Sequence, residues 1–458
     1  MTKIFFTFYL FFLCTLCICN GTIDYYKDIY PIIQNKCYNC HHPNGYSTLV
    51  LDSYQSVKNY SKTIQYVINN NIMPPWKADS SYMHFSNERF LTSAERAKIN
   101  LWVKTKCKEG KITDKQKITT VQYSGKSRVN RKPDLTLHFP EKIIIKNELK
   151  DMFVYIKIPF ELKNDTILDC IEFLPDNIKY LHHLNFKIIA LDSSVNPYEG
   201  KNVFVSFRDN IAEQSKKEIY KALNLLNKNN EIPKESYYGS WVPGMSALDL
   251  KNTPLGVKMP KKGVLLISVL HYAPSSENTT DSSSFNLYFK KLTDLEKTRT
   301  VDHLVVGVGS EAEKSKDIPS LLLIIKPDKK QWFHYKYMVK DDFTIINMNP
   351  HMHLLGKKFY AYAIYDNDTT PLIKIENWDF DWQELYYLKK PMVLKKGTVI
   401  CLDGYYDNTT ENPKNPFSPP RLVSGDDGMQ TSGEMMLLIF QGFPYLKDDE
   451  NMQFKTQY

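Results

Sequence analysis

The first hydrophobic feature along the chain is an apolar run at residues 4–19. Lys3 precedes it with a positive charge, and Asn20 ends it with a polar side chain. A run of about 16 residues has the length of a signal-peptide core and is short for a membrane-spanning helix. We therefore predict a signal peptide at residues 1–21 and an exported protein, periplasmic or secreted. An uncleaved N-terminal membrane anchor is the alternative, and lipid modification of Cys19 is disfavoured because a large isoleucine precedes it.

Residues 22–112 show helical spacing of apolar positions, interrupted by loops. Tyr25–Cys37 is amphipathic, and Ser93–Val103 predicts a second helix. The start of this second helix has the pattern of a capping box, because Thr92 stands three residues before Glu95. We therefore predict a small α-helical domain in this part of the chain.

The pattern changes after residue 133. Short apolar runs are now bounded by Asn, Asp, Gly and Pro, which is typical of antiparallel β-sandwiches. We predict one jelly-roll-like sandwich at residues 134–300 and a second at residues 301–447. A polar linker at residues 113–133 would precede them, and a tail at residues 448–458 would follow.

Composition supports a β-rich protein and excludes one class of partner. The chain has 30 Tyr and 24 Phe, and aromatic side chains fit a pleated, half-buried surface. Its net charge of +8 comes from lysines spread along the chain, without a basic stripe or a nucleic-acid-binding motif. We therefore expect no nucleic-acid partner.

A Cys-x-x-Cys-His motif stands near the start of the predicted helical domain. Cys37 and Cys40 can form two thioether bonds to haem, and His41 can ligate the iron. A disulfide or a zinc site beside a coincidental histidine is the alternative. The remaining cysteines beyond the export segment are dispersed, which argues against a disulfide framework: Cys107, Cys170 and Cys401.

A sixth ligand for this haem is expected in a loop downstream of the motif. Met73 lies in such a loop, held extended by two prolines, and Met83 is the alternative. His42 stands too close to the proximal ligand to bind the same iron easily. This layout resembles that of small c-type cytochromes, in which the Ser93–Val103 helix would be the C-terminal helix.

Five of the 11 histidines fall into three local patterns. His182 and His183 are adjacent, His271 precedes a tyrosine, and His351 and His353 form His-x-His. Adjacent side chains on a strand point to opposite faces, so binding one metal through both requires a bend. The His-x-His spacing places two imidazoles on one face. Imidazole combined with a thioether favours copper over zinc.

With these motifs, residues 134–445 resemble the peptidylglycine and dopamine monooxygenase family. The resemblance implies two copper ions, one that stores and delivers an electron and one that binds O2 and abstracts hydrogen. The two ligand sets implied are His182, His183 and His271 for the first, and His351, His353 and Met435 for the second. Met436 is the alternative to Met435.

Two further motifs look like those of bacterial relatives with an attached cytochrome domain, at Trp378–Gln383 and Tyr406–Thr410. Other positions depart from the family pattern. Asn349 stands where the peptide-processing enzymes have a substrate-binding arginine, and Ile439 stands where they have a tyrosine. The copper ligands therefore fit the family, whereas the substrate-binding residues do not.

Taken together, the expected fold is an α-helical cytochrome c domain followed by two antiparallel β-sandwich copper domains. The expected function is an exported haem- and copper-dependent monooxygenase that hydroxylates an unknown organic substrate with O2. Electrons would pass from haem c, reduced by a redox partner, to copper, with His351, His353 and Met435 as catalytic residues. The alternatives are a non-catalytic electron-transfer or copper-handling protein, and a haem protein whose β domains bind a ligand or partner.

Overall fold

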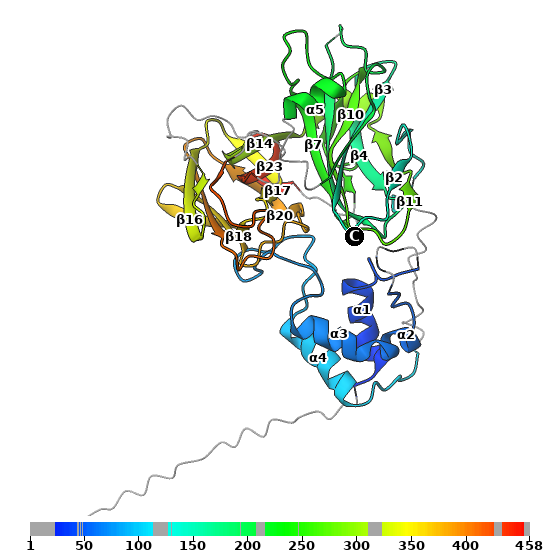
Figure 1. The fold of residues 1–458 in the computed structure, drawn as a ribbon. Coiled ribbons are helices and arrows are strands. Elements are labelled where there is room, and N and C mark those ends of the chain that lie inside the picture. The colour runs from blue at the N-terminus through cyan, green and yellow to red at the C-terminus, as the bar shows by residue number, and fades with distance from the viewer. Residues whose placement is uncertain are drawn as a thin grey trace, which may run out of the picture.

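The computed structural model describes residues 23–43, 45, 47, 49–112, 127–129, 131–192, 194–207, 216–245, 247–309, 323–425 and 433–452. The structure is mostly β-sheet, with 41% strand and 14% helix. Figure 1 shows two β-rich units side by side and a smaller helical segment beneath them. The predicted signal peptide at residues 1–21 lies outside the described residues. Within the described residues, no helix is long and apolar enough to cross a membrane.

The N-terminal segment holds short helices packed on a core of their own. Buried side chains of this core include Ile33, Ile99 and Trp102. The helix predicted at Ser93–Val103 is confirmed, since Thr92 accepts from the Glu95 N–H and Glu95 caps Thr92 in return. The elements are the π-helical turn η1 (Tyr25–Ile29) and the helices α1 (Tyr30–Lys36), α2 (Tyr54–Asn59), α3 (Ser61–Asn69) and α4 (Ser93–Lys104).

The predicted fold class, an α-helical cytochrome c domain followed by two β-sandwich copper domains, is wrong. Among the described residues only five α-helices occur, all short, and no large α-helical domain is evident. Part of the reason lies in the stretch between α3 and α4, which packs on the second β unit. Ala78 and Phe85 form bridges to Ile375 and Leu388 there. Local helical spacing does not reveal such long-range pairing.

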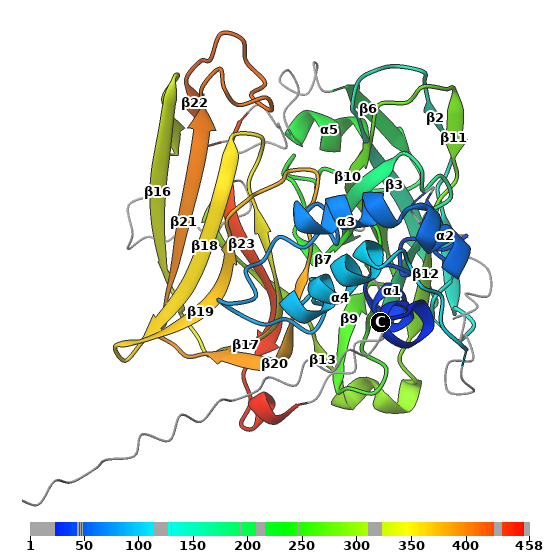
Figure 2. The ribbon, with the colours of Figure 1, turned by 90° about the horizontal axis from the view of Figure 1, so that it is seen from below.

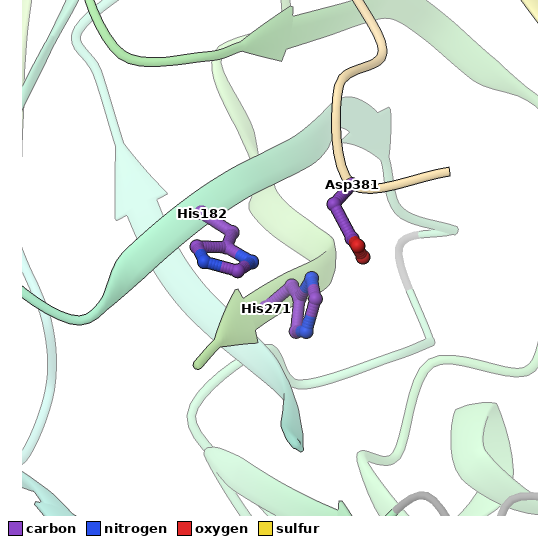
Figure 3. Close-up of side chains that lie close together, drawn as sticks. All are labelled: His182, His271 and Asp381. Atoms are coloured by element: carbon purple, nitrogen blue, oxygen red, sulfur yellow. The ribbon is translucent and has the colours of Figure 1, made fainter. Parts of the chain in front are cut away.

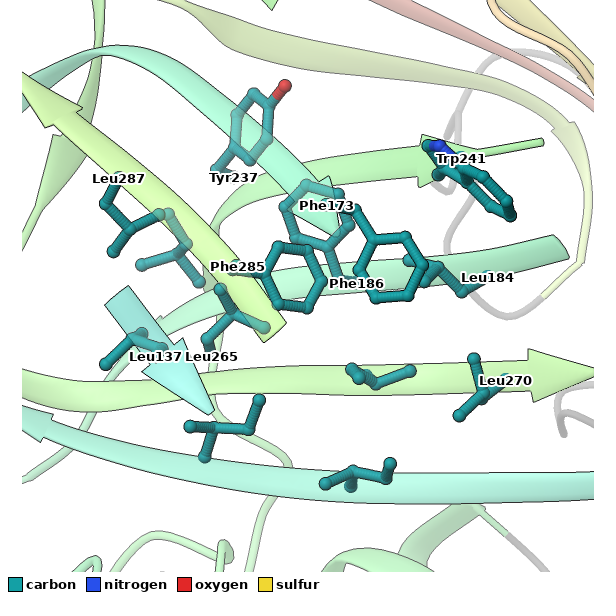
Figure 4. Packing of buried hydrophobic residues seen from close by; sticks show 14 of the residues in the cluster. Leu137, Phe173, Leu184, Phe186, Tyr237, Trp241, Leu265, Leu270, Phe285 and Leu287 are labelled. Carbon is teal, nitrogen blue, oxygen red and sulfur yellow. The ribbon is translucent and has the colours of Figure 1, made fainter. Parts of the chain in front are cut away.

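In the first β unit two large sheets enclose a hydrophobic core, and β2 and β11 form a separate two-stranded sheet. One sheet has the order β1-β12-β4-β9-β13 with β8 beside β4, and the other has the order β6-β3-β10-β5-β7. Figure 4 shows aromatic side chains of the core, such as Phe173, Phe186 and Phe285, meeting between the sheets.

The elements of this unit are β1 (Leu135–His138), β2 (Ile143–Ile145), β3 (Met152–Glu161), β4 (Thr166–Leu174), β5 (Leu181–Ala190), β6 (Val203–Phe207), α5 (Lys216–Ala222), β7 (Glu235–Trp241), β8 (Leu248–Asp249), β9 (Leu255–Met259), β10 (Lys262–Tyr272), β11 (Thr279–Asp281), β12 (Ser284–Phe289), the 3-10 helix η4 (Leu292–Lys297) and β13 (Arg299–Thr300).

Strand β10 contains the apolar run Val264–Ile267, and the structure shows why each of these positions is apolar. Leu265 and Ile267 face the main core of the first unit, whereas Val264 and Leu266 face a smaller cluster formed with α5. Successive side chains of a strand point to opposite faces, so a strand covered on both sides is apolar throughout. Near the end of β10, the side opposite the main core carries His271.

The second β unit also has two facing sheets. Their orders are β14-β23-β17-β20 and β16-β21-β18-β19. The N-terminal segment crosses beneath both units, as the view from below in Figure 2 shows.

The elements of the second unit are β14 (Asp302–Val308), β15 (Ile324–Ile325), β16 (Lys329–Met338), β17 (Phe343–His351), β18 (Gly356–Tyr365), β19 (Asp368–Ile375), β20 (Tyr386–Leu394), β21 (Val399–Asn408), β22 (Val423–Ser424), β23 (Met436–Pro444) and the 3-10 helix η5 (Asp449–Asn451).

Candidate metal centre

The adjacent histidines lie at the start of β5, beside the end of β10. His271 pairs directly with His183, and Tyr272 pairs with Leu181, which leaves His182 as an extra residue in the ladder. An inserted residue of this kind bends a strand and re-aims its side chain. The bend that two adjacent histidines need in order to face one metal is therefore present.

The three imidazoles form a compact cluster with unpartnered nitrogen atoms. The ring centroid of His271 lies 4.9 Å from that of His182 and 5.0 Å from that of His183. The Nδ1 atoms of all three rings are buried and have no hydrogen-bond partner among the described residues. Nε2 of His271 is hydrogen-bonded to Asp151 at 2.9 Å. A carboxylate of this kind commonly orients a metal-binding histidine, and a buried nitrogen without a hydrogen-bond partner is one that a metal ion can satisfy.

The surroundings of His182 and His183 favour the neutral form of the ring, which binds metal. Burial holds the pKa of His183 well below its usual value, and the neighbouring imidazoles of His271, His182 and His351 lower it further. Burial also lowers the pKa of His182, and the neighbouring His271 ring has a smaller effect in the same direction, whereas Asp381 raises the pKa of His182. A neutral imidazole has the lone pair that a metal ligand requires.

The His-x-His pair lies at the end of β17, in the second β unit. The ring centroids of His351 and His353 are 5.0 Å apart. Nδ1 of His351 donates to the side-chain oxygen of Gln383, and Nδ1 of His353 donates to the Gly433 carbonyl at 2.9 Å. Because both partners are oxygen acceptors, the proton of each neutral ring sits on Nδ1 and the lone pair on Nε2.

Glu434 anchors the backbone around this pair. Its carboxylate is fully buried and accepts from the N–H groups of His353 at 2.9 Å, Leu355 at 2.6 Å and Met435 at 3.3 Å. Burial raises the pKa of Glu434 to about 8, although these three hydrogen bonds act in the opposite direction. A single side chain therefore ties the His353 arm to the segment that carries Met435.

The two candidate methionines point to different sides of the sheet. Met436 belongs to the core of the second unit, whereas Met435 packs with Leu437 and with Tyr238 of β7 in the first unit. His351 stands directly opposite Leu437 in the ladder, and opposed side chains share a face. The geometry thus puts Met435 on the same face as His351, and the choice of Met435 as a ligand stays a prediction.

A loop of the second β unit, residues 376–385, connects the two histidine clusters. Phe380 lies between them, with its ring centroid 6.0 Å from that of His183 and 5.9 Å from that of His353. The imidazoles of these two histidines are therefore at most about 12 Å apart. Asp381 reaches the first cluster, where one of its oxygens and single ring nitrogens of His182 and His271 lie within 4.8 Å of one another (Figure 3).

The sequence analysis did not assign roles to four residues that this geometry makes important: Phe380, Asp381, Gln383 and Glu434. The first three belong to the Trp378–Gln383 motif, which was noted only for its resemblance to bacterial relatives. The density of aromatic and acidic residues in that motif was the signal that could have found them. Glu434 directly precedes the candidate ligand Met435 in the sequence, which was the signal for that position.

The Cys-x-x-Cys-His motif follows directly after α1 in a tight turn. The N–H groups of Cys40 and His41 both donate to the Cys37 carbonyl, at 3.2 and 3.1 Å. Both cysteines are free thiols, and burial raises the pKa of each. Nδ1 of His41 is hydrogen-bonded to the Leu49 carbonyl at 2.8 Å, which leaves Nε2 as the nitrogen with the lone pair.

The candidate sixth ligands have different surroundings. Met73 is 39% exposed, and its N–H donates to the Val67 carbonyl at the end of α3. Met83 packs against the core of the second β unit. Trp76, which could have packed on a haem, instead contacts Phe85 and Tyr386.

The haem motif packs against the first β unit and lies near the second. A β-carbon at Gly244, after β7, would lie 2.5 Å from Sγ of Cys40 and 3.6 Å from the Arg89 guanidinium. Arg89 forms an ion pair of 2.5 Å with Glu384, next to Gln383 in the loop at residues 376–385. The motif is therefore adjacent to the loop that joins the two histidine clusters.

A cavity of about 420 Å³ lies beside this contact. His42 and Arg128 line one side of it, and Phe173, Trp241 and Tyr387 line other parts. None of the six residues predicted to bind copper lines the cavity.

Comparisons with known proteins give one informative match. No curated protein matches the chain. Among solved structures, VP54 of PBCV-1, fitted into a cryo-EM reconstruction of the virophage Sputnik, is 9% identical with a TM-score of 0.19, and the match covers 69% of this chain and 95% of that one. An allantoicase is 10% identical with a TM-score of 0.17, and the match covers 69% of this chain and 80% of that one. Scores this low carry no argument about fold or function.

The informative match is to a family model. Residues 327–416 match the C-terminal domain of the copper type II ascorbate-dependent monooxygenases. The matched segment includes His351, His353 and the loop at residues 376–385. It supports a monooxygenase-like copper module in this chain and, more generally, a copper-dependent oxidoreductase.

Proposed function

We propose that this chain is an exported haem- and copper-dependent monooxygenase that hydroxylates an organic substrate with O2. The observation that carries the proposal is the meeting of two histidine clusters, one from each β unit, on either side of Phe380. Three buried Nδ1 atoms in the first cluster lack a hydrogen-bond partner among the described residues, as expected of nitrogens that ligate a cation.

The side chains present fit copper. His182, His183 and His271 would hold one ion, and His351, His353 and Met435 would hold the other. Imidazole suits copper in both oxidation states, and a thioether favours Cu(I). When bound, the coppers would supply the O2 chemistry and the haem would supply the electrons.

The chain's own residues orient these ligands. Asp151 fixes the ring of His271, and Gln383 fixes the ring of His351. The Gly433 carbonyl and the Glu434 carboxylate hold the side chain and the backbone of His353. Partners of this kind typically change metal affinity by about 10–100-fold when they are removed.

The Cys-x-x-Cys-His turn fits covalent haem. Cys37 and Cys40 are free, and the Leu49 carbonyl orients His41 so that Nε2 has the lone pair. Met73 would be the sixth ligand, with Met83 as the alternative. The proposal concerns haem attachment at this turn and does not require a large helical domain around it.

The closeness of the haem motif to the loop at residues 376–385, through Arg89, supports the haem as the electron source. Cys40 and Arg89 both lie against Gly244, and Arg89 pairs with Glu384. These contacts place the motif near the loop that separates the two histidine clusters. A redox partner outside the chain would reduce the haem, in the periplasm or outside the cell, with an N-terminal anchor as the alternative to a cleaved signal.

The proposal is tested by following electrons from haem to O2. The haem is reduced fully, the free reductant is removed, O2 is added, and haem reoxidation is recorded. Reoxidation should be at least about tenfold slower in His271→Ala than in the wild type. The control is His334→Ala, which removes a histidine that is 68% exposed and pairs with Asp403.

Equal rates in the wild type and His271→Ala would show that the haem does not pass electrons through that cluster. Substrate-dependent O2 uptake separates the enzyme from an electron carrier. A carrier would consume O2 at the same rate with and without any organic substrate offered.

A further inference from the structure

The first histidine cluster belongs to one β unit, but a carboxylate of the other unit lies beside it. Asp381 extends from the loop at residues 376–385 toward His182 and His271, as Figure 3 shows. The ligand atoms of these three residues lie within 4.8 Å of one another, close enough for a single ion to contact all three.

The histidines on the first unit's side of this contact have buried nitrogens that a cation could bind. His183 and His271 are only 2% and 1% exposed, and their Nδ1 atoms have no hydrogen-bond partner among the described residues. Burying such atoms without a partner is unfavourable, and coordination of a cation would satisfy them. A site made of a divalent ion and three imidazoles has a net charge of two, and an adjacent carboxylate would lower that net charge.

The Asp381 side chain is held in place by other groups. Its Oδ2 accepts from Nζ of Lys414 at 2.8 Å, and its N–H donates to Oδ1 of Asp379. Lys414 also bonds Asp379 at 2.7 Å, so the lysine fixes both acidic side chains of the loop. Asp381 therefore uses one oxygen for the lysine and keeps a second oxygen for another partner.

We infer that Asp381 is a fourth ligand of the His182/His183/His271 copper, supplied across the boundary between the two β units. The inference rests on the proposed function, in that it takes the three histidines to hold copper. A nitrogen and oxygen ligand set of this kind suits Cu(II), whereas the thioether of Met435 suits Cu(I). The carboxylate would thus make the two sites unequal in the oxidation state that they favour, and copper would tie the loop at residues 376–385 to the first unit.

The test compares Asp381→Asn with Asp379→Asn in the full-length holo-haem protein, stripped of copper and titrated with Cu(II). Asp379 is a matched control because it carries the same charge, lies two residues away and shares the Lys414 partner. An amide oxygen at either position can still accept a hydrogen bond, so the loop keeps its contacts. The readouts are the affinity for each copper equivalent and the Cu(II) electron paramagnetic resonance spectrum.

In Asp381→Asn, one copper equivalent should bind about tenfold more weakly or worse, with an altered spectrum, and the other should bind normally. Asp379→Asn should match the wild type in both readouts. Wild-type binding and spectrum in Asp381→Asn would overturn the inference, as would an equal loss in both variants, which would indicate a general charge effect.

The inference and the proposed function fail in different ways. If the wild type and His271→Ala bound the same amount of copper, the copper assignment would be wrong. If the wild type bound that copper and Asp381→Asn bound it equally well, only the fourth ligand would be wrong.

Discussion

Replacing Glu434 with alanine should loosen the arm that carries His353 and the segment that carries Met435. The carboxylate accepts the N–H groups of His353 at 2.9 Å and Leu355 at 2.6 Å, and the longer bond from Met435 at 3.3 Å adds less. A buried N–H left without an acceptor costs ~1–3 kcal/mol. Loss of the two shorter bonds should therefore destabilise the arm locally by about 3 kcal/mol.

Amide hydrogen exchange measures this effect at the residues concerned. Since about 1.4 kcal/mol corresponds to a factor of ten, the Leu355 amide should exchange about a hundredfold faster in Glu434→Ala. Glu434→Gln keeps one acceptor oxygen and should give an intermediate increase. The amide of Tyr335, in the other sheet of the unit, serves as the internal control and should not change.

The same variant tests the link between this anchor and the metal. Glu434→Ala should also weaken the copper bound by His351 and His353, by about 10–100-fold, and leave the other copper unaffected. Unchanged exchange at Leu355 together with unchanged copper affinity would refute the argument that the carboxylate positions this arm.

Three further predictions follow from particular side chains. Burial alone would raise the pKa of Asp379, but hydrogen bonds and charge from Lys414 and Lys77 lower it to about 2. The ionised Asp379 should therefore contribute ~2 kcal/mol to the free energy of unfolding. This contribution should be complete above about pH 4 and lost as the pH falls to about 2. Asp379→Asn should therefore flatten the acid limb of a stability-against-pH curve, and an unchanged limb would contradict the pairing. Met73→Ala should change the absorption spectrum and the reduction potential of the haem. If these changed in Met83→Ala and not in Met73→Ala, Met83 would be the sixth ligand instead. Glycine-extended peptides should be poor substrates in a turnover assay. Asn349 is 1% exposed and its amide donates to the Glu384 carbonyl, so it cannot bind the peptide carboxylate. Efficient turnover would show that another residue binds this carboxylate.

Local patterns in the sequence predicted some features well. The capping residues Thr92 and Glu95 set the start of α4, and the apolar run at Val264–Ile267 became the centre of β10. Binding of one metal by both His182 and His183 would require a bend in the strand, and the inserted residue in β5 is such a bend. In each case the signal lies within a few residues of the feature that it predicts.

The features that were missed depend on residues far apart in the sequence. Asn87 accepts from the Tyr387 N–H across 300 positions, and the stretch around it packs on the second β unit instead of completing a helical domain. Asp381 meets His182 only because the two β units pack together. Periodicity describes one element at a time, so it contains no information about which loop reaches a distant strand.

Copper content tests the central claim most directly. The purified protein, loaded with copper and freed of excess metal, should contain two coppers per chain. His271→Ala and His353→Ala should each contain one, with the haem intact in both variants. Full retention of copper in both variants would contradict the account, and loss of both coppers in each would indicate one shared site instead of two.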